Sequence, residues 1–106
     1  MISRDAMFRS LADPTRRSLF EMLCREGELP VSELTKGTSI SQPAVSKHLG
    51  ILRDAGLIAG RPDGRNTYYE AKPETLEAMA DWMGEMRGFW AHRLDSLEEL
   101  LDRLDQ

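Results

Sequence analysis

Residues 39–58 constrain the fold most, because they contain the start and stop signals of one short amphipathic helix. Ser41 suits the N-cap position, and Pro43 lies near the first turn, where its missing N–H sacrifices no hydrogen bond. Gly56 provides a stop, since glycine tolerates the left-handed backbone that ends many helices. One apolar stripe recurs at helical spacing between them: Val45, Leu49 and Leu52.

The other side of this predicted helix carries small and hydrogen-bonding side chains and few acids. They are Gln42, Ser46, Lys47 and Arg53. A DNA major groove admits one helix and presents donors, acceptors and thymine methyl groups. A shorter helix is expected just before it, from Pro30 to near Gly37. Two short, tightly joined helices, the second carrying the groove-facing residues, predict a helix-turn-helix.

Two strand-like runs follow directly, over residues 57–61 and 66–71. The residues between them, 62–65, are typical of a turn, so the pair predicts a β-hairpin. In this position the hairpin is interpreted as the wing of a winged helix-turn-helix. Arg61 and Arg65 near its tip would reach a phosphate or a minor groove. The alternative is a solvated turn with no role in binding.

The N-terminal part predicts a helix over residues 5–12 and a second helix over 14–26, with Asp13 as its N-cap. Arg16 and Arg17 fall in the first turn of the second helix. A cation is unfavourable at that end of the helix dipole, so both side chains need a partner. Solvent or an intramolecular ion pair is the first interpretation, and a DNA phosphate is the alternative.

A long helix is predicted over residues 74–104, which corresponds to about 45 Å. Its apolar stripe outruns the rest of so short a chain, and an exposed apolar face indicates an interaction surface. We therefore expect a homodimer formed through the first and last helices. The expected interface residues are Met7, Phe8, Leu11, Met79, Trp82, Met83, Met86, Phe89, Trp90, Leu94 and Leu97.

The net charge of −4 hides an uneven distribution. Residues 36–65 hold five bases and two acids, a local charge of +3, whereas residues 73–106 hold three bases and nine acids, a local charge of −6. Binding follows the local field more than the total, so the basic middle remains suited to nucleic acid.

The length of 106 residues fits one domain over residues 1–106, with 74–104 as its dimerisation helix. The single cysteine, Cys24, rules out an internal disulfide framework and suits a reducing cytoplasm. The sequence contains no run of about 18 apolar residues, so no membrane partner is expected. The expected architecture is therefore a mainly α winged helix-turn-helix with one β-hairpin, located in the cytoplasm.

Several segments together resemble a known family by their order and spacing. They are Asp13-Pro14-Thr15-Arg16-Arg17, Ser41-Gln42-Pro43-Ala44-Val45-Ser46-Lys47-His48-Leu49, Leu52-Arg53-Asp54-Ala55-Gly56-Leu57-Ile58, and the hairpin from Gly60 to Tyr69. The chain resembles the ArsR/SmtB family of bacterial transcriptional repressors over nearly its whole length. The resemblance implies a winged-helix dimer that binds an inverted-repeat operator near a promoter and blocks transcription.

The resemblance and the helix geometry together assign the DNA contacts. The expected DNA-binding residues are Ser41, Gln42, Pro43, Ala44, Ser46, Lys47, His48, Arg53, Arg61 and Arg65. Gln42 suits a bidentate pair with adenine, and Lys47 suits guanine or a phosphate. His48 lies between the buried and exposed arcs of the helix, so a structural hydrogen bond and a DNA contact both remain open.

The sequence departs from the family's metal sensors. Residues 30–35, where arsenic and cadmium/lead sensors carry their thiolates, contain no cysteine. Asp81 is followed two residues later by Met83 where zinc sensors have a histidine, and the helix has only His92. A typical site needs about four ligands. No metal or other cofactor is therefore expected, and residues 82–95 resemble a non-metal subgroup that includes autorepressors.

Three alternatives remain open at this point. The first is a metal-, redox- or small-molecule-responsive repressor that uses Cys24 or His92, although a buried thiol is the simpler interpretation of Cys24. The second, of another class, is a winged helix that binds a protein. An enzyme is the third and least favoured, because no nucleophile–base set or glycine-rich phosphate loop is readable.

Overall fold

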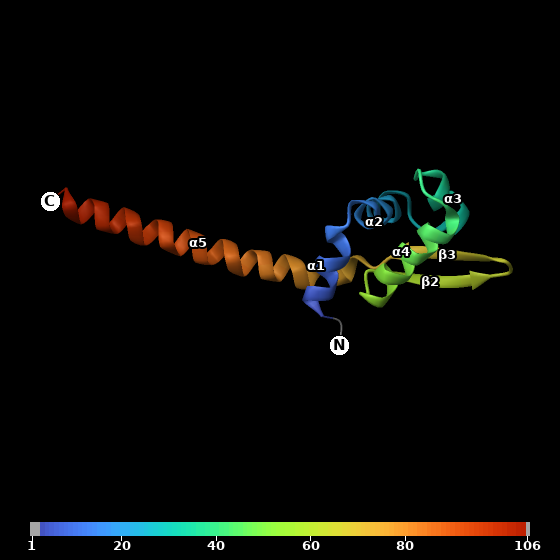
Figure 1. Ribbon diagram of the computed structural model, residues 1–106. Coiled ribbons are helices and arrows are strands. Elements are labelled where there is room, and N and C mark those ends of the chain that lie inside the picture. The colour runs from blue at the N-terminus through green and yellow to red at the C-terminus, as the bar shows by residue number, and fades with distance from the viewer. Residues whose placement is uncertain (1–2, 106) are drawn as a thin grey trace. The chain divides into compact units, whose positions relative to one another are not determined.

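The computed structural model describes residues 3–105, which form one compact unit up to Leu76 and a second from Glu77 onward. Within them the predicted winged helix-turn-helix architecture is confirmed (Figure 1). The elements are α1 (Arg4–Ala12), α2 (Pro14–Glu26), β1 (Leu29–Pro30), α3 (Val31–Lys36), α4 (Gln42–Asp54), β2 (Ile58–Asp63), β3 (Asn66–Ala71), the 3-10 helix η1 (Pro73–Thr75) and α5 (Leu76–Leu104).

Both predicted N-caps are confirmed. The Asp13 carboxylate accepts hydrogen bonds from the backbone N–H groups of Thr15 at 2.9 Å and Arg16 at 3.0 Å, which satisfies two free donors of α2. The Ser41 hydroxyl accepts from the N–H of Ala44 at 3.3 Å. These caps set the first residues of α2 and α4, the two longest helices of the first unit.

The end of α4 is a Schellman motif centred on Gly56, whose φ is +80°. The N–H of Leu57 donates to the carbonyl of Leu52 at 3.0 Å, and the N–H of Gly56 donates to that of Arg53 at 2.9 Å. Leu52 and Leu57 are both fully buried, which gives the motif its usual apolar contact. The predicted stop signal therefore also sets the direction in which the chain enters β2.

The core of the first unit draws side chains from three helices and from Leu57, in the short link between α4 and β2. Its fully buried members are Leu19, Leu23, Leu34, Val45, Leu49, Leu52 and Leu57. The predicted stripe of α4 is therefore buried as expected. Because α2 supplies two of these leucines, α4 packs on α2 with its opposite face left outward.

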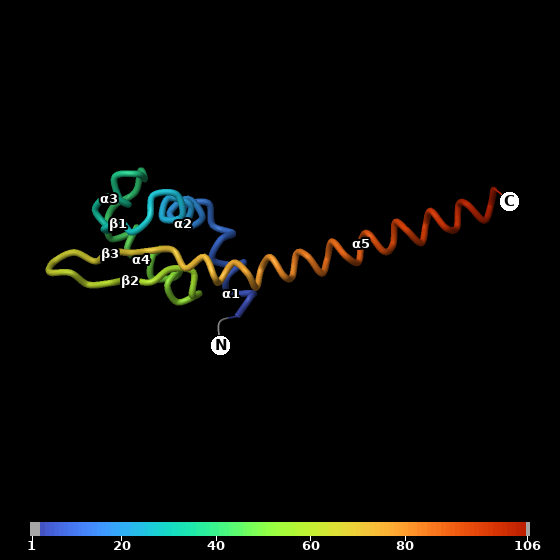
Figure 2. Tube along the Cα trace, turned by 180° about the vertical axis from the view of Figure 1, so that it is seen from behind, coloured from blue at the N-terminus to red at the C-terminus, as the bar shows by residue number. Residues whose placement is uncertain are grey.

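The sheet has three antiparallel strands in the order β1-β3-β2 (Figure 2). The prediction of residues 62–65 as the turn was wrong in extent: Pro62 lies in β2 opposite Thr67, and the turn is Gly64-Arg65. Proline is tolerated there because β2 is an edge strand. The sequence analysis did not predict the two-residue strand β1, because its pairing with β3 joins residues about forty positions apart.

The second unit contains nearly all of the helix α5, and most of the large apolar residues of this helix are solvent-exposed in the single chain. The exposed large apolar residues are Met83, Phe89, Trp90, Leu94, Leu97, Leu100, Leu101 and Leu104. None of the helices in residues 3–105 is long and apolar enough to cross a membrane.

Candidate nucleic-acid interface

The outward face of α4 presents the predicted groove-reading side chains. Gln42, Ser46 and Lys47 are exposed, and within residues 3–105 none of the three side chains has a hydrogen-bond or ion-pair partner. Pro43 is exposed beside them. The donors and acceptors of these side chains are therefore available to a binding partner.

Three further predicted contact residues have other tasks or partial exposure. Ser41 is exposed, but its hydroxyl caps α4. Ala44 is half-buried. Arg53 is exposed and lies 3.5 Å from the carboxylate of its neighbour Asp54, an exposed pair that contributes little.

Within residues 3–105, Arg16 and Arg17 form no ion pair with an acid, and both instead donate to backbone carbonyls at the end of the preceding helix. Arg16 Nε donates to the carbonyl of Ser10 at 2.8 Å, and Arg17 Nη1 donates to that of Leu11 at 2.9 Å. These carbonyls belong to the last turn of α1. The carbonyl groups of a last helical turn have no N–H partner within the helix and carry a partial negative charge. The arginines at the start of α2 therefore cap the end of α1.

His48 forms the structural contact that the sequence left open. Its Nδ1 lies 3.4 Å from Arg16 Nη1, so the middle of α4 is linked to the junction of α1 and α2. The ring is half-buried. The backbone hydrogen bond from Arg16 is the main cause that lowers the pKa of the nearby Asp13 carboxyl, and the charge of Arg16 adds to it.

Arg61 of the wing is occupied within the chain. Its guanidinium donates to both carboxylate oxygens of Glu28, at 2.8 and 3.4 Å, and lies 5.0 Å from the centre of the Tyr68 ring. Asp63 adds a contact at 3.7 Å. The hydrogen bond from Arg61 lowers the pKa of Glu28, and the same bond raises the pKa of Arg61.

Arg65 contrasts with Arg61. It lies in the turn of the hairpin, is exposed, and has no hydrogen-bond or ion-pair partner among residues 3–105. The hairpin extends beyond α4 in both views of the molecule (Figures 1 and 2). Of the two predicted wing arginines, Arg65 is therefore the one with its charge available to DNA.

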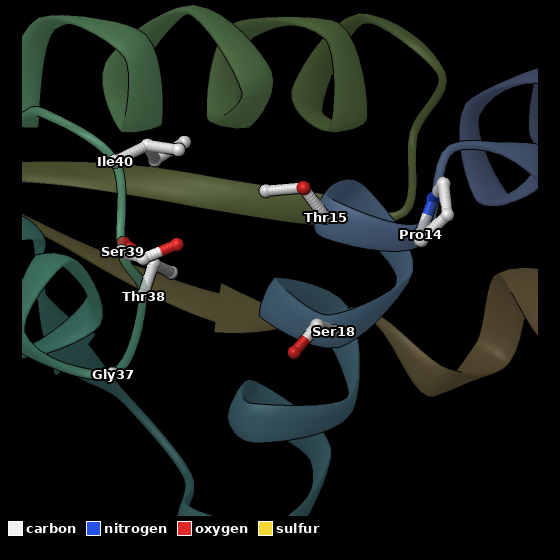
Figure 3. A pocket seen from close by; sticks show the side chains of 7 residues that line it. All are labelled: Pro14, Thr15, Ser18, Gly37, Thr38, Ser39 and Ile40. Carbon is white, nitrogen blue, oxygen red and sulfur yellow. The ribbon is translucent and has the colours of Figure 1, made fainter.

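A hollow of about 290 Å³ lies between the first turns of α2 and the α3–α4 turn (Figure 3). Thr15 and Ser18 contribute hydroxyls from α2, and Thr38 and Ser39 contribute them from the turn. Thr38 donates to the carbonyl of Thr35, while the other hydroxyls have no hydrogen bond within the described chain. The sequence analysis did not predict this cluster of hydroxyl side chains, because tertiary packing alone brings the start of α2 close to the α3–α4 turn.

The candidate metal or redox residues, Cys24 and His92, do not belong to a set of metal ligands within residues 3–105. Cys24 is exposed, so its interpretation as a buried thiol was wrong. Partial desolvation and the neighbouring Glu21 raise the pKa of this thiol, which keeps it protonated near neutral pH. His92 is exposed on α5. Among residues 3–105, no group of three or more His, Cys, Asp or Glu side chains is arranged to hold a metal ion.

The residues expected at a dimer interface differ in exposure. Met7 and Met79 are buried in the single chain, and Phe8, Leu11, Trp82 and Met86 are half-buried. The others, Met83, Phe89, Trp90, Leu94 and Leu97, are exposed. On α5 a shallow apolar hollow of about 320 Å³ is lined by Trp82, Met86, Phe89, Trp90 and Arg93.

A family model described as "Bacterial regulatory protein, arsR family" matches residues 13–59, which run from the N-cap of α2 into β2. The HTH-type transcriptional regulator Rv2034 of Mycobacterium tuberculosis is 37% identical over 100 residues, covering 94% of this chain and 90% of the relative. The arsenic resistance transcriptional regulator ArsR2 of Pseudomonas putida is 34% identical over 96 residues, covering 80% and 84%.

Solved structures extend the comparison to the fold. The ArsR-like transcriptional regulator from Rhodococcus sp. RHA1 superimposes with a TM-score of 0.77 and 27% identity, covering 91% of this chain and 90% of that chain. A second structure, of the ArsR family transcriptional regulator RHA00566, has the same TM-score with 34% identity, covering 82% and 89%.

The Glu28–Arg61 pair predicts a measurable titration. Because Arg61 stabilises the charged form, the Glu28 carboxyl should titrate below the range of an ordinary glutamate, and the pair should break only as pH falls through that lowered pKa. Carbon-13 NMR should show the pKa of Glu28 rising in Arg61→Ala. Arg65→Ala is the matched control and should leave it unchanged; an equal rise in both variants would contradict the assignment.

Proposed function

Since this chain belongs to the arsR family and is a DNA-binding transcriptional regulator, we propose that it is a homodimeric repressor that binds an inverted-repeat operator without a metal ion. The observation that carries the proposal is the outward face of α4, where Gln42, Ser46 and Lys47 have no partners in the described chain. Two such helices about 34 Å apart would occupy successive major grooves of one duplex.

We also propose that the protein binds its operator without a metal ion. Relatives include regulators named for arsenic resistance, such as ArsR2 of Pseudomonas putida. In this chain, however, Cys24 has a raised thiol pKa and lies on α2, while His92 lies on α5. Metal binding needs a deprotonated thiolate and several further ligands, and these two side chains supply neither.

The deciding experiment is binding of the purified protein to the DNA upstream of its own gene, with a random duplex of equal length as control. We expect tight, salt-sensitive binding that prefers the upstream DNA and is unchanged by a chelator. A shift in affinity on adding the chelator would overturn the metal-independent proposal. Equal affinity for both duplexes at every salt concentration would overturn the expectation that the upstream DNA contains an operator for this protein.

Gln42→Ala should reduce operator affinity by about 1–3 kcal/mol and relax specificity at one base pair, because a bidentate amide contact is removed. Fluorescence anisotropy with operator variants mutated at single positions would measure both effects. Asp54→Asn, a change at the other end of α4, is the control for general effects on the helix. Unchanged discrimination at every position in Gln42→Ala would exclude Gln42 from base reading.

Arg65→Ala should weaken binding to all sequences and reduce the slope of log K against log salt by about 1, because one phosphate contact is lost. Arg61→Ala provides the comparison within the same hairpin. Its guanidinium is held by Glu28, so we expect the smaller change in slope. A larger change for Arg61→Ala than for Arg65→Ala would reverse the proposed roles of the two arginines.

Dimerisation is proposed to use the exposed apolar face of α5, because contiguous apolar patches of this kind are rare on monomers. Leu97→Lys should raise the dimer dissociation constant at least tenfold, since burial of a leucine stabilises an interface by about 1.5–3 kcal/mol. Glu99→Gln changes the net charge equally but removes no apolar side chain. Analytical ultracentrifugation would test this, and a wild-type monomer at micromolar concentration would refute the dimer.

A further inference from the structure

Arg16 holds three segments of the first unit together through one guanidinium group. Its Nε donates to the carbonyl of Ser10 at 2.8 Å, and its Nη2 donates to that of Arg9 at 3.5 Å, so α1 fixes the plane of the group. The remaining nitrogen, Nη1, lies 3.4 Å from Nδ1 of His48. The guanidinium therefore meets the α4 ring from a position set by the backbone.

The chemistry of this contact determines which ring nitrogen carries the proton. Arginine stays protonated in proteins and has donors only, so Nδ1 of His48 must accept. An imidazole that accepts at Nδ1 is neutral and carries its proton on Nε2. Since the two nitrogens lie at different edges of the ring, the Nε2–H group is directed away from Arg16.

The Nε2–H group has no partner within the described chain, and the His48 ring is only half-buried. It also follows directly after Ser46 and Lys47 of the outward face. Phosphate oxygens and the O6 and N7 atoms of guanine are the acceptors that DNA offers to such a donor.

We propose that Arg16 is a positioning residue for operator binding: it selects the Nε2–H form of His48, and this N–H donates to an acceptor atom of the DNA. The inference rests on the proposed function, because it assumes that α4 meets an operator. It gives His48 both of the roles that the sequence left open, since the structural bond at one nitrogen prepares the DNA contact at the other.

Two substitutions of His48 separate these roles. In His48→Asn the amide oxygen lies near the place of Nδ1 and can still accept from Arg16, but no atom replaces Nε2. In His48→Gln the longer amide reaches toward the place of Nε2 and keeps a donor for DNA. We expect operator affinity to fall about tenfold in His48→Asn, as for the loss of one hydrogen bond to a strong acceptor. The loss of affinity in His48→Gln should be at least threefold smaller than in His48→Asn.

The same pair of variants identifies the acceptor. An equal loss on the operator and on a random duplex would indicate a phosphate oxygen, whereas a loss confined to the operator would indicate a base edge. Wild-type affinity in His48→Asn, or tighter binding by His48→Asn than by His48→Gln, would overturn the proposal. Circular dichroism and the mass in solution control for misfolded variants.

A second experiment tests the role of Arg16 on the free protein, without DNA. Nitrogen-15 NMR of the His48 ring in the free wild-type protein should show Nδ1 unprotonated and Nε2 protonated at neutral pH, and Arg16→Met should shift the ring toward a mixture of the two neutral forms. A wild-type ring protonated at Nδ1 would overturn the inference. If the wild type bound no DNA, the proposed function would fail, whereas this NMR result would still judge the role of Arg16.

Discussion

Burial of one stripe of α4 is the constraint on which the rest of the first unit depends. Val45, Leu49 and Leu52 are all fully buried, and their burial leaves only one rotation of the helix about its axis. Since side chains at positions three and four apart share a face, fixing this stripe also fixes where Gln42, Ser46 and Lys47 point. The direction of the outward side of α4 is thus determined by the residues on its opposite side.

The segment from Asp13 to Arg17 complements this constraint by joining helices through their ends. Asp13 caps the start of α2, while Arg16 and Arg17 cap the end of α1, so three side chains of this segment satisfy free backbone groups on both sides of a sharp turn. The lowered pKa of Asp13 has the same origin, chiefly the N–H of Arg16. Arg16 then carries the connection onward to His48, which couples the α1–α2 turn to the middle of α4.

The parts of the fold that local chemistry determines were predictable from the sequence. The caps at Asp13 and Ser41, the stop at Gly56 and the period of the apolar stripes depend on residues within a few positions of one another, and the structure confirms each of them. The partners of Arg16, Arg61 and the two-residue strand β1 were not predictable. Each depends on a contact that only the tertiary fold creates, such as Glu28 with Arg61, thirty-three positions apart.

The candidate site shows the same division, and this explains why composition alone misjudges it. Counting bases gives the wing two equal arginines, yet the fold commits Arg61 to Glu28 and leaves Arg65 without a partner in the described chain. A charge that is already paired within the protein gains less free energy on binding a phosphate, because its ion pair with the first partner must be broken. Arg65, without a partner in the described chain, thus adds its charge to the basic stretch over residues 36–65, whose local excess of bases attracts anions although the net charge of the chain is negative.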